Sequence, residues 1–349
     1  MQDGKGLVAA DQPFYCELRA GQRSLWCACG KSATQPYCDG KSHIGTGFLP
    51  VLYRAKADEE VLFCGCKQTS TPPFCDGAHS NLAGGYTDEG DRGEDQAVAL
   101  VSPDREGFAR LDGDCYVVSP GKSLTDLSPD CRISALVTPD LGSRHQSQFY
   151  LELDRGQSPM FGADGEVVIW VAKGEGRIII GGERFALSQM SGAFVLADET
   201  FALEGENLVC YISVCPAADS LRIVQEQAAF HDAQPERMGL IDEGARTEMG
   251  PRYFQVLLDD TDGLTNSAQF IGHIPKSRAK MHRHLYEEAL IIVSGHGMIW
   301  NETRRAQVRA GDVIFFPRKH VHSLQSLSED GMDVVGFIHP GTNPGINYY

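Results

Sequence analysis

The feature of the sequence that most constrains the fold is an internal repeat in the C-terminal two thirds of the chain. Residues 166–178, EVVIWVAKGEGRI, line up with residues 287–299, EEALIIVSGHGMI, about 120 residues further on. Both copies later place a glycine before another apolar run, at Gly192 and at Gly311. Self-similarity at one fixed offset indicates a structural unit that is present twice. The sequence therefore predicts two similar domains.

The repeated units have the texture of β-sheet proteins. Short runs rich in β-branched residues alternate with turns of Gly, Asp and Pro, at residues 167–171, 177–180, 288–293 and 312–316. Such runs are typical of strands, and no long amphipathic helix pattern interrupts them. Many short strands in regular succession favour a barrel or a sandwich. We therefore expect a mostly β chain with two β-barrels.

The second copy carries three histidines and one glutamate at short separations, in two groups. His282 and His284 are two positions apart and share one face of a strand, Glu288 follows at even spacing, and His322 comes after a turn at Pro317. Three imidazoles and one carboxylate suit Fe(II), Mn(II) or Ni(II), with positions left for O2 and substrate. A sugar-binding or storage-type barrel with incidental histidines is the alternative.

These motifs resemble the two motifs of the cupin family. They read H-x-H-x3-E-x6-G over residues 282–295 and G-x5-P-x4-H over residues 311–322, with Lys319 at a position usually held by glycine and no glycine six residues before His282. The resemblance implies a barrel that binds one divalent metal, Fe(II) being favoured, through His282, His284, Glu288 and His322. His320 competes with His322, and the motif spacing favours His322. By strand parity Arg278, Lys280 and Tyr286 are candidate substrate contacts, and a solvated basic loop is the alternative for Arg278 and Lys280.

The first copy lacks these ligands. Alignment of the two repeats places Phe161, Ala163 and Val167 where the second copy has its two histidines and its glutamate. The segment at residues 200–203, opposite His322, carries no histidine. The first barrel is therefore predicted to be a degenerate cupin without metal, with a role in packing or dimer contact.

Two cysteine-rich cassettes precede the barrels. The first has Cys27, Cys29, Cys38 and His43, the second has Cys64, Cys66, Cys75 and His79, and each follows the order C-x-C, eight residues, C-D-G, then H. Three thiolates and one imidazole form a complete ligand set for a soft metal centre. A structural zinc site is the alternative, and it would be colourless.

This pattern resembles the CDGSH iron–sulfur domain, in tandem over residues 14–82. The resemblance implies that each cassette binds one [2Fe–2S] cluster through its three cysteines and its histidine. The first cassette departs from the pattern, because Lys41 is inserted and Ser42 occupies the expected place of the histidine. Serine is a poor iron ligand, so we expect the loop to bulge and His43 to bind.

Net charge and cysteine content limit the possible partners and the cellular compartment. A net charge of −16 argues against nucleic acid and anionic membranes as partners. No signal peptide or long apolar span is evident, and the five cysteines outside the cassettes are scattered, so we predict a cytoplasmic protein. The predicted domains are an iron–sulfur domain at 1–82, an acidic glycine-rich linker at 83–105, a degenerate cupin at 106–230 and a metal-binding cupin at 231–349.

The combination of modules favours an O2-dependent oxidoreductase. We expect a non-haem cupin oxygenase that acts on a small molecule, an amino acid or a thiol such as cysteine, while two [2Fe–2S] clusters donate electrons to the mononuclear site or tune it. The expected partners are an electron-donor protein and a second copy of the chain, in a homodimer through the barrels. The alternatives are a non-redox cupin isomerase or aminohydrolase with redox-sensing clusters, and a non-enzymatic cluster carrier or redox sensor.

Overall fold

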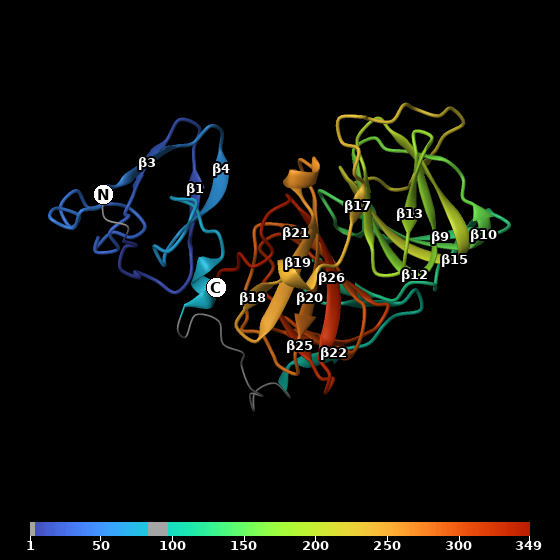
Figure 1. Cartoon of the computed structure of the whole chain (residues 1–349). Coiled ribbons are helices and arrows are strands. Elements are labelled where there is room, and N and C mark those ends of the chain that lie inside the picture. Colours follow the sequence, from blue (N-terminus) through green and yellow to red (C-terminus); the bar gives the residue numbers. More distant parts are fainter. Residues whose placement is uncertain (1–3, 83–96) are drawn as a thin grey trace.

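The computed structural model describes residues 4–82 and 97–349, so most of the predicted linker lies outside the described residues. It contains a small N-terminal module followed by two barrels (Figure 1). Within the described ranges, regular structure consists of strands and short 3-10 turns, and no helix there is long and apolar enough to cross a membrane. The prediction of a mostly β chain, with two barrels behind a small N-terminal domain, is confirmed.

The N-terminal module is built from two antiparallel strand pairs. β1 pairs with β4, and β2 pairs with β3. Each cassette begins where a strand ends, since Trp26 closes β2 before Cys27 and Phe63 closes β4 before Cys64. Both aromatic rings are buried in the small core. The elements are β1 (Phe14–Leu18), β2 (Arg23–Trp26), β3 (Val51–Arg54), β4 (Glu59–Phe63) and the 3-10 turn η1 (Ala78–Asn81).

The first barrel is one highly curved sheet. Its longest strand, β12, joins two of the predicted runs, because Gly174 adopts φ +86° and register shifts on either side of Lys173 absorb the kink. A side chain at Gly174 would collide with the backbone of Asn207. The strands are β8 (Thr125–Ser128), β9 (Cys131–Val137), β10 (Ser147–Gln157), β11 (Phe161–Gly162), β12 (Glu166–Ile180), β13 (Glu183–Leu187), β14 (Gly192–Val195), β15 (Thr200–Cys215), β16 (Arg222–Ile223) and β17 (Met238–Gly239), with η3 (Pro139–Leu141).

The second barrel combines an eight-stranded and a four-stranded sheet. Its strands are β5 (Ala99–Val101), β6 (Phe108–Arg110), β7 (Tyr116–Val118), β18 (Thr247–Met249), β19 (Arg252–Leu258), β20 (Ala268–Ile274), β21 (Glu287–Ile292), β22 (His296–Trp300), β23 (Arg304–Arg309), β24 (Val313–Phe316), β25 (Ser323–Ser326) and β26 (Met332–His339), with η4 (Glu243–Ala245) and η5 (Asp260–Asp262).

Strand pairing corrects the predicted domain limits of 106–230 and 231–349. β5, within the predicted linker, pairs with β23, and β7 pairs with β24, so both belong to the second barrel. In the opposite direction, β17 pairs with β14 of the first barrel. The reason is that open sheet edges recruit whichever strand can satisfy their hydrogen bonds, whatever its place in the sequence.

The two barrels are joined by a buried layer and by a reciprocal pair of carboxylates. Glu287 of the second barrel accepts hydrogen bonds from the backbone N–H groups of residues 144–146 at 3.0–3.3 Å and from the hydroxyl of Ser143 at 2.6 Å. Glu166, its counterpart in the repeat, accepts bonds from Thr265 and Asn266 of the second barrel. The repeat thus builds its own pseudo-symmetric interface within one chain. The homodimer stays a prediction.

Candidate metal centres

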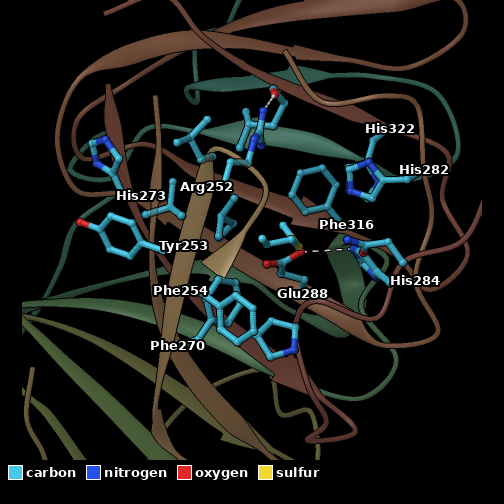
Figure 2. A pocket seen from close by; sticks show the side chains of 18 of the residues that line it. Arg252, Tyr253, Phe254, Phe270, His273, His282, His284, Glu288, Phe316 and His322 are labelled. Atoms are coloured by element: carbon cyan, nitrogen blue, oxygen red, sulfur yellow. Dashed lines mark hydrogen bonds and ion pairs between the residues drawn. The ribbon is translucent and has the colours of Figure 1, made fainter. Parts of the chain in front are cut away.

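The four predicted ligands of the second barrel line one cavity of about 100 Å³. Figure 2 shows His282, His284, Glu288 and His322 turned toward a common space. Backbone bonds of 2.9 Å in both directions join His282 to His322, and their ring centroids are 4.5 Å apart. The four residues of this motif therefore lie around a single concave site.

Hydrogen bonds orient each of the three imidazoles. In every case Nδ1 contacts a backbone carbonyl oxygen at 2.7–2.9 Å, namely that of Lys280 for His282, of Tyr286 for His284 and of His320 for His322. An Nδ1–H donor leaves the lone pair on Nε2, which is the arrangement of metal-binding histidines. Burial lowers the pKa of His282 to about 4 and that of His322 well below its usual range, so both are neutral at pH 7.

Two of the candidate ligands also make an unfavourable contact that a bound cation would relieve. Nε2 of His284 is buried without a hydrogen bond and lies 3.2 Å from Oε2 of Glu288. A lone pair facing a carboxylate oxygen at this distance is repulsive, and a metal ion between them would remove the repulsion. Within residues 4–82 and 97–349, however, no three His, Cys, Asp or Glu side chains converge tightly enough to enclose one ion. Coordination by all four side chains therefore stays a prediction.

The corresponding positions of the first barrel are filled by apolar side chains. Phe161 pairs with Phe201 at a centroid distance of 5.3 Å, where the second barrel pairs His282 with His322. Both rings are buried, as are Ala163 and Val167. The first barrel has therefore exchanged a polar cavity for a packed core at the same place in the fold.

Of the three predicted substrate contacts, only Tyr286 lines the cavity. Its ring stacks on His284 at 3.9 Å, and its hydroxyl donates to the carbonyl of Pro344 at 2.9 Å, so it positions the imidazole. Arg278 instead packs on Trp300, and Lys280 lies near Tyr349. That prediction was wrong because strand alternation does not apply between β20 and β21, where the chain is irregular.

The sequence analysis missed Arg252, which lines the cavity from β19. Its guanidinium is buried and donates to the carbonyl of Leu324 at 3.2 Å. The remaining wall is mainly apolar and includes Phe254, Phe270 and Phe316 (Figure 2). The available signal was an arginine that starts an otherwise apolar strand. His320 does not line the cavity, and its carbonyl holds His322.

In each cassette of the N-terminal module the donors come in two pairs. The Sγ atoms of Cys27 and Cys29 are 3.6 Å apart, and Cys38 Sγ is 3.3 Å from His43 Nδ1. The second cassette repeats this with 3.5 Å between Cys64 and Cys66 and 3.3 Å between Cys75 and His79. Two separate pairs suit a two-iron cluster in which each iron takes two protein ligands, whereas zinc needs four donors around one ion.

Hydrogen bonds to the Asp39 carboxylate stabilise the loop that contains the inserted Lys41. This carboxylate accepts hydrogen bonds from the backbone N–H groups of Lys41 and Ser42 at 3.1 and 2.8 Å. The loop bulges, and His43 lies as far from its cysteine as His79 does from its own. Ligation by His43 stays a prediction, which this geometry supports.

A buried lysine lies between the two cassettes. Lys67 is only 4% exposed, donates to the carbonyl of Cys64 at 2.8 Å and places its ammonium 4.6 Å from the centre of the Trp26 ring. Burial lowers the pKa of Lys67, and the charges of Cys64, Cys27, Cys66 and Cys29 act in the opposite direction. Its backbone has φ +63°, at a position where the first cassette has Gly30 with φ +77°.

The second cassette packs directly on the second barrel. Cys75 and Leu62 share a buried apolar cluster with Tyr348 and with Leu285, the neighbour of His284. Tyr348 in turn exchanges backbone hydrogen bonds of 2.9 and 3.0 Å with Arg283, which stands between the two histidines of the motif. The C-terminal segment thus links Cys75, a predicted cluster ligand, to the predicted metal site of the second barrel.

Polar contacts fix the same junction. Glu60 of β4 forms ion pairs with Lys319 and Arg318 of the barrel. Asn343 donates to the carbonyl of Asp76 at 3.1 Å, and Tyr15 stacks on Tyr348 at 5.8 Å. The module is therefore docked by charge, hydrogen bonds and ring contacts at once.

Comparisons with known proteins found similarity for the second barrel and for the N-terminal module. A family model described as "Cupin domain" matches residues 272–336. CDGSH iron-sulfur domain-containing protein 3, mitochondrial, of Mus musculus is 44% identical over 54 residues, which are 15% of this chain and 39% of that protein. The Homo sapiens protein of the same name is also 44% identical over 54 residues, or 42% of its length. The match thus spans less than half of these relatives.

Solved structures share the double-barrel fold. Protein Ylba from E. coli superposes with a TM-score of 0.50 at 14% identity, over 71% of this chain and 97% of that one. Oxalate decarboxylase from Lactobacillus farciminis gives 0.51 at 12%, over 65% and 86%, and procruciferin, an 11S globulin from Brassica napus, gives 0.53 at 11%, over 66% and 87%. Such identities establish the fold alone. The chain therefore combines an N-terminal segment similar to CDGSH iron–sulfur proteins with a double-barrel fold, and part of its second barrel matches the cupin family model.

Proposed function

We propose that the chain is a metal-dependent cupin oxygenase of small molecules, supplied with electrons by its own iron–sulfur module. His282, His284, Glu288 and His322 would hold the metal, with Fe(II) favoured, and each cassette would hold one [2Fe–2S] cluster. A redox metal at this site supplies O2 binding and substrate oxidation. We place the protein in the cytoplasm.

The observation that carries this proposal is the junction between the second cassette and the metal motif. Cys75, Tyr348, Arg283 and His284 form a continuous path of packed or hydrogen-bonded residues. The arrangement supports electron transfer from the second cluster to the barrel.

Lys319 independently supports a functional contact between the N-terminal module and the second barrel. It stands where cupins usually have glycine, and its backbone has φ +64°, a conformation that costs a lysine on the order of 1 kcal/mol. Its ammonium reaches Glu60 of the iron–sulfur module. The position thus keeps a strained residue whose side chain holds the module in place.

The cavity indicates the substrate class. Its walls are largely phenylalanine, and Arg252 is a buried cation that would bind a carboxylate. Tyr286 holds His284 in orientation through ring stacking. A small amino acid, or a thiol compound with a carboxylate such as cysteine, combines these requirements.

Two other functions remain as outcomes of the test. The similarity to an oxalate decarboxylase fold is compatible with a non-redox cupin enzyme, an isomerase or aminohydrolase, in which the clusters sense redox state. A non-enzymatic cluster carrier or redox sensor is the third possibility.

The test is a single-turnover experiment on the holoprotein. Metal analysis and EPR before and after dithionite count the clusters and identify the mononuclear ion. The reduced protein is then mixed with O2 and with candidate amino acids and thiols. We expect substrate to accelerate both O2 uptake and cluster reoxidation, and we expect His282→Ala to abolish this acceleration while the cluster spectrum persists.

A matched pair of variants tests the junction. Tyr348→Ala should slow cluster reoxidation, whereas alanine at the adjacent and more exposed Tyr349 should have little effect. Manganese without mononuclear iron, together with turnover that consumes no O2, would replace the proposal with the non-redox enzyme.

A further inference from the structure

An exposed apolar and basic surface lies beside the first cassette. Strands β2 and β3 pair so that Arg23 faces Arg54 and Leu25 faces Leu52. These four side chains point outward, with the leucines 47% and 58% exposed, while Trp26 is buried on the opposite side. We call these four residues the β2–β3 face.

The β2–β3 face is unfavourable for an isolated module. Like charges opposite each other on paired strands repel, and within the described residues neither arginine forms an ion pair with an acidic side chain. The segment that connects His43 to β3 adds Ile44 and Leu49, which are 74% and 77% exposed. Leu25 and Leu52 are cross-strand neighbours, and exposed apolar side chains placed side by side in this way mark interaction surfaces.

The face adjoins the more accessible of the two cassettes. The carbonyl of Leu25 accepts a hydrogen bond from the backbone N–H of Cys38 at 2.7 Å. Cys38 and His43 are half-buried, whereas Cys75 and His79 are buried, with the second cassette packed on the barrel. Figure 1 shows β3 on the side of the module away from the barrels. A partner therefore has access to the first cassette and not to the second.

The charge of the module is split between its two halves. Residues 19–56 contain six lysines and arginines against one acidic residue, Asp39, in a chain whose net charge is −16. Residues 57–82 contain one basic residue, Lys67, against four acidic ones. The acidic half is docked on Lys319 and Arg318 through Glu60. The basic half is left to face solvent.

We propose that the β2–β3 face, with Ile44 and Leu49, is the docking surface for a small acidic one-electron carrier protein. One electron leaves the reduced carrier and is gained by the oxidised cluster of the first cassette, and no bond or proton is exchanged. An apolar centre with basic neighbours suits the small, transient and salt-sensitive interfaces of electron transfer. The inference rests on the proposed function, because that function sets the direction of electron flow. Electrons would pass from the first cassette to the second cassette and then to the barrel.

The test measures reduction of the holoprotein by a reduced acidic plant-type ferredoxin in an anaerobic stopped-flow instrument. We expect the second-order rate constant to fall as salt is added. Arg23→Glu combined with Arg54→Glu should lower it about ten-fold or more at low ionic strength. Leu25→Gln with Leu52→Gln should lower it at all salt concentrations. The control is Arg177→Glu with Arg184→Glu, two exposed arginines on the first barrel that give the same change in net charge.

Dithionite should reduce every variant at the same rate, which shows that the clusters are intact. Equal rates for the two arginine pairs, or a rate that ignores salt, would overturn the proposal. A dimer of this chain that the β2–β3 substitutions convert to monomer would also overturn the proposal, since the face would then bind a second copy. The readout does not involve the cupin site, so rapid reduction followed by no substrate-dependent O2 uptake would refute the proposed function and leave the docking surface standing.

Discussion

If each cassette holds a [2Fe–2S] cluster, as proposed, replacing Lys67 by methionine should lower the reduction potentials of both clusters together. The ammonium is buried between the cassettes, and its charge interacts with two thiols of each one. A reduced cluster carries one more negative charge than an oxidised cluster, so a nearby cation favours the reduced form and its loss disfavours it. Methionine keeps the apolar stem and the left-handed backbone and removes only the charge.

The magnitude follows from Coulomb's law. At a separation of about 8 Å and an effective dielectric constant of about 20, the interaction is about 2 kcal/mol. Because about 1.4 kcal/mol corresponds to about 59 mV for one electron, the expected shift is on the order of 50–100 mV downward for each cluster. An exposed lysine would give far less, since water and salt screen its charge.

The assay is an anaerobic redox titration of the two clusters by absorbance and EPR. Lys31→Met is the matched control, because Lys31 also follows a C-x-C pair but its side chain is exposed. Lys67→Gly restores the residue found at the equivalent position of the first cassette, where Gly30 stands, and should show the same shift without backbone strain. A shift confined to one cluster, or no larger than that of Lys31→Met, would refute the assigned position of the charge.

Three further predictions concern the barrels. His282→Ala should remove one mononuclear metal ion per chain and leave the cluster iron unchanged, as measured by metal analysis. Arg252→Leu should raise the dissociation constant of carboxylate-bearing substrates about 10- to 100-fold, since it removes a charged hydrogen-bond donor, and calorimetry would measure this. Glu287→Ala should lower the free energy of unfolding by about 2–4 kcal/mol, because four donors of the first barrel lose their acceptor, and denaturant titration would show it.

Controls separate these effects from general damage. Phe161→Ala in the first barrel should leave the mononuclear metal in place, and loss of metal there would contradict the assignment of the site. Arg252→Lys should keep part of the carboxylate affinity, so equal losses in both variants would contradict a charge contact. Glu166→Ala should destabilise the chain as Glu287→Ala does, and an asymmetric result would argue against a reciprocal interface.

Much of the candidate site was accessible to sequence reasoning because motif spacing encodes it. The resemblance to the cupin motifs points to His282, His284, Glu288 and His322, and these four residues line one cavity. The absence of metal ligands from the first barrel can also be predicted from the sequence, since Phe161 occupies the position that aligns with His282. Parity failed for Arg278 and Lys280, because the chain between β20 and β21 is not a strand.

The two modules, the repeat and the candidate ligands can be inferred from the sequence, since these features depend on residue type at short, fixed separations. Tertiary structure alone decided which strands complete which barrel, that Arg252 enters the cavity, and that Lys67 lies between the cassettes. It also decided that the second cassette, through Tyr348, contacts the metal motif. These features join residues tens to hundreds of positions apart, where local patterns carry no information and only sheet pairing and the docking of surfaces select the neighbours.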